Sequence, residues 1–183
     1  MGLTIRSAAA LAAGAAALAG CATPEMPQKG AFVPFSEVMA ETSGKPWECT
    51  AYEAATDSCE ALSTYELTGD RIDSRGQFVI DTRPSIIAAG AVRFRERDGR
   101  ACGNLGQMRM SFDGLDDPQA ETFIREAVRA TFGQMGEICV SYFRAGEDRY
   151  VVEARDAAGA LIPDGTDVVT FFADKKALRE ADL

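Results

Sequence analysis

The chain has 183 residues, of which 46% are hydrophobic, and both values are typical of one globular domain. Its 28 acidic residues exceed its 19 basic residues, and the resulting net charge of −9 disfavours binding to nucleic acid. It contains no histidine, which excludes Ser-His-Asp and Cys-His catalysis and any zinc site that needs imidazole.

Residues 1–20 have the pattern of an export signal. Arg6 and the amino terminus supply a short positive start, and an uncharged run from Ser7 to Gly20 follows. As a helix this run would extend only about 21 Å, which is too short for a stable membrane span. We therefore predict a signal peptide at residues 1–20.

The end of this segment, Leu18-Ala19-Gly20-Cys21, resembles the lipobox of bacterial lipoproteins. In that family the cysteine thiol receives a diacylglyceryl group, a signal peptidase cuts just before the cysteine, and the new amino group is acylated in many species. The resemblance implies that Cys21 is the lipid-bearing first residue of the mature chain, which makes the membrane a partner. Ala22, at the position that sorts such proteins, implies the periplasmic face of the outer membrane. The alternative is an ordinary secretory leader.

The mature chain is predicted to begin with a flexible tether at residues 21–33, followed by a single domain at residues 34–183. Pro24, Pro27 and few apolar side chains favour a tether over a folded element.

The cysteines indicate disulfides. If Cys21 carries lipid, four of the five cysteines remain, and in an oxidising compartment they are expected to form two disulfides. Four cysteines allow three connectivities. We favour Cys49–Cys59, which brackets a short polar connection, and Cys102–Cys139, which joins an early strand to the strand after the main helix. The chain has no C-x-x-C and no zinc-module spacing, so we predict structural bridges, no metal and no cofactor.

A short helix is predicted at Phe35–Ser43, with Ser36 as its N-cap and Gly44 as its stop. A turn is predicted at Ser74-Arg75-Gly76 and a hairpin at Asp98-Gly99. The predicted strands before the main helix are Trp47–Tyr52, Cys59–Leu67, Gln77–Thr82, Ala91–Arg97 and Met108–Phe112.

The main helix is predicted at Pro118–Phe132, because Asp117 is a good N-cap and apolar residues recur at i, i+3 and i+4. Strands are predicted after it, and the tail Lys175–Leu183 is predicted to be a short helix or frayed. Those strands are Ile138–Phe143, Tyr150–Arg155 and Val168–Ala173. Together these elements predict an α+β fold, a mostly antiparallel sheet with the main helix packed on one face.

The preferred candidate site is a stripe of arginines, which could bind an anionic partner through one face of a strand. The alternative is a charged strand face that keeps the sheet soluble. The stripe consists of Arg93, Arg95, Arg97 and Arg100.

Three weaker candidates have structural alternatives. The first is an acidic cluster before the main helix, read as calcium ligands or helix capping: Asp113, Asp116 and Asp117. The second is a set of carboxylates, read as acid–base pairs or surface charge: Glu48, Glu53, Asp57 and Glu60. The third is a set of aromatic residues, read as a ligand groove or core: Trp47, Tyr65, Tyr142 and Tyr150.

No catalytic motif is present in the sequence, and whether the protein is an enzyme stays open. We favour a lipid-anchored, non-catalytic envelope module whose partner is an envelope protein or a cell-wall component. The alternatives are a histidine-free hydrolase that uses paired carboxylates and a binder of a small apolar ligand inside the domain.

Overall fold

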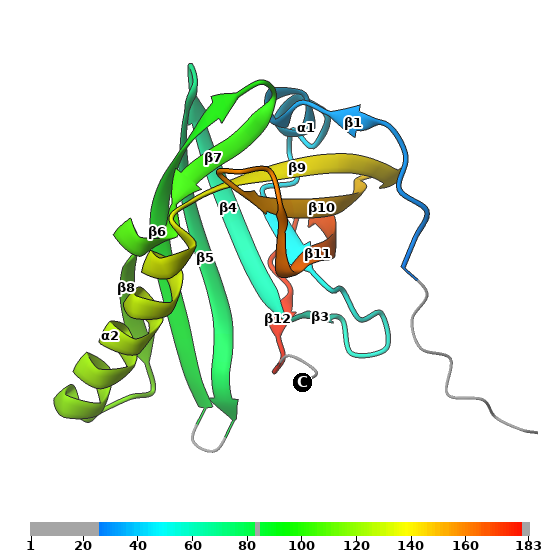
Figure 1. Ribbon diagram of the computed structural model, residues 1–183. Helices are drawn as coiled ribbons and strands as arrows, with labels where there is room; N and C mark the ends of the chain where they lie inside the picture. The colour runs from blue at the N-terminus through cyan, green and yellow to red at the C-terminus, as the bar shows by residue number, and fades with distance from the viewer. Residues whose placement is uncertain (1–25, 83–84, 181–183) are drawn as a thin grey trace, which may run out of the picture.

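The computed structural model describes residues 26–82 and 85–180, so the predicted signal peptide and Cys21 lie outside the described residues. Strands dominate the described part (Figure 1). The strands are β1 (Phe32–Val33), β2 (Trp47–Thr50), β3 (Ser58–Cys59), β4 (Ala61–Thr68), β5 (Arg71–Thr82), β6 (Ser85–Arg97), β7 (Arg100–Asn104), β8 (Arg109–Asp113), β9 (Glu137–Gly146), β10 (Arg149–Asp156), β11 (Leu161–Phe172) and β12 (Ala177–Leu178). The helices are α1 (Phe35–Glu41), the 3₁₀ turn η1 (Leu105–Gln107) and α2 (Pro118–Met135).

Eight strands form a closed antiparallel barrel, in the order β2-β4-β5-β6-β7-β9-β10-β11 and back to β2. The barrel closes where β7 pairs with β9, with Cys102 opposite Cys139. At the other junction β11 pairs with β2, with Phe171 opposite Glu48. Full closure leaves neither of these sheet edges unpaired.

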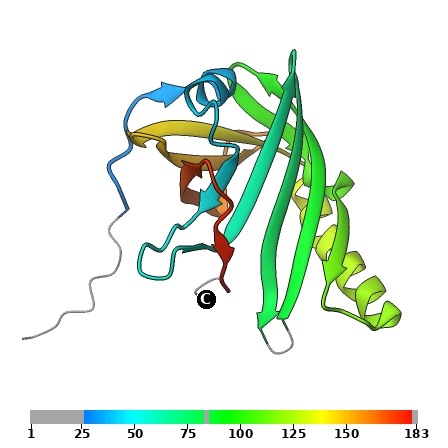
Figure 2. The same ribbon diagram turned by 180° about the vertical axis from the view of Figure 1, so that it is seen from behind.

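The predicted α+β class is therefore wrong. Alternating strands predict one open sheet that needs a helix to cover it, whereas the observed sheet covers its own apolar face by closing. The helix α2 contributes no buried residue, and its Phe123 is 74% exposed. It lies beside β6 and β8, on the side of the sheet opposite to the face that Figure 2 turns toward the viewer (Figures 1 and 2).

Several elements also differ from the sequence prediction. Ser74, Arg75 and Gly76 lie inside β5 instead of forming a turn, because β5 pairs with β4 over its whole first part. The described part of the tail contains β12, which pairs parallel to β3, instead of the predicted short helix. In the first helix the cap position is Pro34, whereas Ser36 donates a hydrogen bond to Glu96. The Asp117 cap is confirmed, since its carboxylate accepts from two α2 amides.

The described contacts of the domain begin earlier than residue 34. Lys29 pairs with Glu153 at 2.5 Å, and Gly30 donates its amide hydrogen to the Arg144 carbonyl. Strand β1 then adds to the outer edge of β9.

The main core occupies the α1 end of the barrel. Side chains alternate between interior and exterior along each strand, and the inward rings of Tyr65, Tyr142 and Tyr150 pack together with Phe35 of α1. Phe35 is fully buried, so α1 closes this end as a plug (Figure 1).

A second, smaller core lies on the outer surface. It contains the Cys49–Cys59 disulfide and Leu62, with Tyr52 and Phe172 packed around them. The other disulfide is Cys102–Cys139, so both bridges have the pairing that the sequence favours. No helix in the described residues is long and apolar enough to cross a membrane.

We predict that replacing both Cys102 and Cys139 by alanine weakens the barrel at its closure. The bridge closes a loop with a sequence separation of 37, so its loss should lower the free energy of unfolding by about 3–4 kcal/mol. Urea denaturation of the variant and the wild-type chain measures this difference. Faster amide exchange in β7 and β9 than in β4 is expected alongside it. An unchanged urea midpoint would show that strand pairing alone holds the closure.

Candidate functional site

A groove lies on the outer face of the sheet formed by β4, β5, β6 and β8. This face is turned toward the viewer in Figure 2, whereas α2 lies behind the sheet. The groove has a volume of about 460 Å³. Its lining consists of Trp47, Leu62, Thr64, Arg75, Gly76, Gln77, Ala89, Gly90, Ala91, Arg109, Met110 and Ser111.

The strand register explains the shape of the groove. Arg75 of β5, Ala91 of β6 and Arg109 of β8 are direct cross-strand neighbours in one row. In the next row Ala89 lies between Gln77 and Ser111. Because neighbouring strands lie about 4.8 Å apart, the two arginine Cα atoms are roughly 10 Å apart. The two small alanines form a low floor between longer side chains.

The floor is supported from the other side of the sheet. A Cβ atom on Gly90 would lie 2.6 Å from the Met108 sulfur, so only glycine fits there without displacing Met108. Packing against Met108 therefore favours glycine at this position.

The charges in the groove differ from those of the rest of the chain. Among the described residues, Arg75 and Arg109 form no ion pair, and the groove lining contains no carboxylate. Its polar side chains include Thr64, Gln77 and Ser111, each of which can donate a hydrogen bond. In a chain of net charge −9, this concentration of donors without acids favours an anionic ligand.

The C-terminal segment reaches the edge of the groove. Lys175 donates a hydrogen bond of 2.8 Å to the side-chain oxygen of Gln77. Its ammonium also lies 5.4 Å from the centre of the Trp47 ring. Trp47 is the only tryptophan of the chain, so its fluorescence can report on binding in the groove.

Comparisons of the chain with models of protein families, with curated proteins and with solved structures found no match. The case for a site therefore depends on its geometry.

The predicted arginine stripe lies beside this groove. Three of its members face outward and form ion pairs: Arg93 with Asp73, Arg95 with Asp70 and Arg97 with Glu137. Arg93 lines a polar recess of about 460 Å³ that shares Arg75, Ala91 and Arg109 with the groove. Arg97 and Arg100 instead line a separate recess near the Cys102–Cys139 disulfide. The stripe is thus divided between two surfaces, and pairing with acids neutralises most of it.

The sequence gives no signal for Arg75 and Arg109 as a pair, because they belong to strands that are far apart in the chain. The sequence pattern predicts a turn at Arg75 and an outward strand position at Arg109. The register of β5, β6 and β8 places them in one row, and a single chain pattern does not encode that register.

The aromatic candidates are divided between the barrel interior and the outer groove. Tyr142 and Tyr150 are only 3% and 1% exposed, and with Tyr65 they face the barrel interior as core. Trp47 instead lines the outer groove.

The carboxylate candidates do not converge on one cleft. Asp57 pairs with Lys176 and Glu60 pairs with Arg179 on the outer surface. Glu48 faces the interior, where its two carboxylate oxygens accept hydrogen bonds from Tyr65 (2.7 Å) and Tyr142 (2.8 Å). Of the acidic cluster before α2, Asp117 acts as the helix cap, and no cluster suited to a metal occurs in the described residues.

Burial dominates the behaviour of Glu48. Glu48 is only 5% exposed. Burial raises the pKa of its carboxyl from 4.5 to about 7. The two tyrosine hydrogen bonds oppose this rise in pKa, and the negative charge of Asp167 adds to it. Burial also raises the pKa of Tyr65 and Tyr142 well above 10. The tyrosines therefore stay protonated and act as donors to Glu48.

We predict that Glu48 makes the protein less stable as the pH rises from 4.5 to 7. In this window the unfolded chain releases the Glu48 proton while the folded chain keeps it, so this group should remove about 3 kcal/mol of stability by pH 7. The Glu48→Gln variant cannot titrate at this position. The unfolding free energy of E48Q minus that of wild type should therefore rise by about that amount across the window.

The exposed residue Glu66 provides a matched control through Glu66→Gln. Urea unfolding at several pH values measures both variants against wild type. A flat difference between E48Q and wild type would show that Glu48 has the same pKa in the folded and unfolded chains.

Proposed function

We propose that the protein is a lipid-anchored module of the bacterial cell envelope that binds an anionic group of an envelope component in the groove between β4 and β8. The observation that carries the binding proposal is the pair of arginines, Arg75 and Arg109, facing each other across an alanine floor without acidic partners. Arginine recognises carboxylate and phosphate groups through two parallel hydrogen bonds, so this pair suits such a group.

The lipid anchor and the envelope location are supported by the lipobox-like Leu18–Cys21. The disulfides Cys49–Cys59 and Cys102–Cys139 suit an oxidising, extracytoplasmic environment. We place the protein at the periplasmic face of the outer membrane, because Ala22 follows the cysteine.

Binding is favoured over hydrolysis by the state of the buried acids. A paired-carboxylate mechanism needs two acids that reach one substrate, whereas both oxygens of Glu48 are already engaged by tyrosines inside the barrel. The interior at the α1 end is filled by aromatic rings, so an apolar ligand at that end is also disfavoured.

We predict that the mature chain begins at Cys21 and carries acyl groups. Intact-mass analysis of protein purified from the membrane fraction should show the loss of residues 1–20 and the added mass of two or three acyl chains. Cys21→Ser should move the protein into the soluble fraction, because the chain then lacks its lipid. A retained leader, or an unmodified Cys21, would contradict the lipoprotein assignment.

We predict that orthophosphate, used as a probe at low salt, changes the fluorescence of Trp47 by occupying the groove. Arg75→Gln and Arg109→Gln should each weaken this binding about tenfold, because each removes a charge-assisted hydrogen bond. Arg95→Gln is the control, since Arg95 is also exposed, on β6, but is paired with Asp70. Equal titration curves for all four proteins would refute the groove as an anion site.

A further inference from the structure

We propose that Lys175 is a third ligand-binding cation of the groove, and that the natural ligand carries a diphosphate or another group with at least two negative charges. This inference rests on the proposed function, because it specifies the ligand of the same groove.

The first step is the position of Lys175 relative to the arginine row. Its ammonium is hydrogen-bonded to Gln77, which lies two residues from Arg75 on the same face of β5. Residues two apart on a strand are separated by about 7 Å. Lys175 therefore adds a positive charge over the second row, beside the Arg75–Ala91–Arg109 row.

The second step is the pairing of Lys175. Its described contacts are the neutral oxygen of Gln77 and the face of Trp47, and it forms no ion pair among the described residues. Its neighbour Lys176, by contrast, pairs with Asp57 at 2.9 Å. Three cations without acidic partners thus border one groove in an acidic chain. One negative charge would leave two of them uncompensated, which favours a ligand with several charges.

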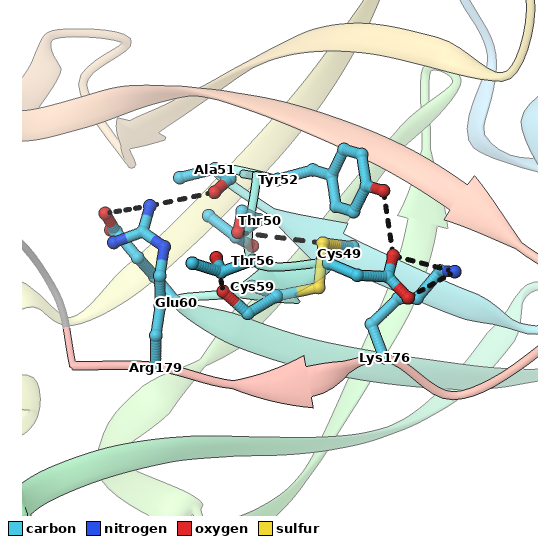
Figure 3. Close-up of a disulfide and its surroundings, with 11 residues drawn as sticks. Cys49, Thr50, Ala51, Tyr52, Thr56, Cys59, Glu60, Lys176 and Arg179 are labelled. Carbon is cyan, nitrogen blue, oxygen red and sulfur yellow. Dashed lines mark hydrogen bonds and ion pairs between the residues drawn. A yellow bond between two sulfur atoms is a disulfide. The ribbon is translucent and has the colours of Figure 1, made fainter. Parts of the chain in front are cut away.

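The third step is the way in which the segment holding Lys175 is fixed. Strand β12 pairs with β3, and Arg179 donates its amide hydrogen to the Cys59 carbonyl at 2.8 Å. Figure 3 shows Lys176 and Arg179 on opposite sides of the Cys49–Cys59 disulfide. Lys176 pairs with Asp57, and Arg179 pairs with Glu60. These contacts hold the segment beside the groove in the absence of ligand, so less conformational entropy is lost when a ligand binds.

The fourth step concerns the remaining surface. Gln77 uses its oxygen for Lys175 and keeps its amide hydrogens available, and Ser111 lies across Ala89 from it. The two phosphates of a diphosphate share a bridging oxygen, so they would lie next to each other between Ala91 and Ala89. One would point toward the two arginines and the other toward Lys175. The uncharged part of the ligand would pack against Trp47 at the side of the groove.

The test compares acetate, orthophosphate and pyrophosphate as probes of the purified mature chain, with Trp47 fluorescence as the readout. Wild type should bind pyrophosphate about tenfold more tightly than orthophosphate, and acetate most weakly. Lys175→Gln should remove most of the pyrophosphate advantage while changing orthophosphate binding less than about threefold. Lys45→Gln is the matched control, because it removes the same charge from a lysine paired with Asp148 at the α1 end.

The outcomes separate this inference from the proposed function. If the wild type binds none of the probes, or if R75Q and R109Q bind as wild type does, the groove itself fails as an anion site. If the arginine variants lose orthophosphate binding but K175Q and K45Q give the same pyrophosphate curve, only the role of Lys175 fails. If wild type binds neither pyrophosphate nor orthophosphate more tightly than acetate, the ligand class is overturned, because acetate carries a single negative charge. Unfolding curves of each variant verify that it is folded.

A second arm identifies the source of the charged group. Wild-type protein is placed in phosphatidylcholine vesicles with or without phosphatidic acid, and pyrophosphate is titrated. If phosphatidic acid weakens the pyrophosphate response, a lipid headgroup competes for the groove and is assigned as the source. If the response is the same in both vesicles, the charged group belongs to a soluble ligand.

Discussion

Closure of the barrel is the constraint on which the other features depend. Once β7 pairs with β9, each strand has one face toward a shared interior and one toward the outside. The interior at the α1 end then has to accommodate aromatic rings, Phe35 and the side chain of Glu48. The outside has to accommodate the charged residues, several of which form ion pairs on β5 and β6. The Cys102–Cys139 bridge joins the two strands where the closure occurs.

Closure also explains why a glutamate is tolerated in the interior. Glu48 lies on the inward face of β2 and forms no ion pair with any described residue, and two tyrosine hydroxyls from β4 and β9 donate to its oxygens. Three separate strands thus meet at one carboxyl group. The arrangement ties together parts of the barrel that are distant in sequence, while burial still favours the protonated acid.

The outer groove follows from the same alternation. Small residues at Ala89 and Ala91 of β6 lower the surface between β5 and β8, and the register sets an arginine on each side. Most other arginines near this face are neutralised by aspartates, as Arg71 and Arg93 are by Asp73. The local positive charge therefore remains at the groove even though the protein as a whole is acidic.

Local sequence patterns predict those features that depend only on residues close together in the chain. Alternation predicted most strands, Asp117 and Pro118 predicted the start of α2, and cysteine spacing favoured the observed pairing. The lipobox-like leader is also a local signal, and it stays a prediction. The barrel, the inward position of Glu48 and the row formed by Arg75 and Arg109 were decided by the tertiary structure. Each depends on which strands pair and in what register, and pairing between distant segments depends on burial of the whole sheet, which no short stretch of sequence contains.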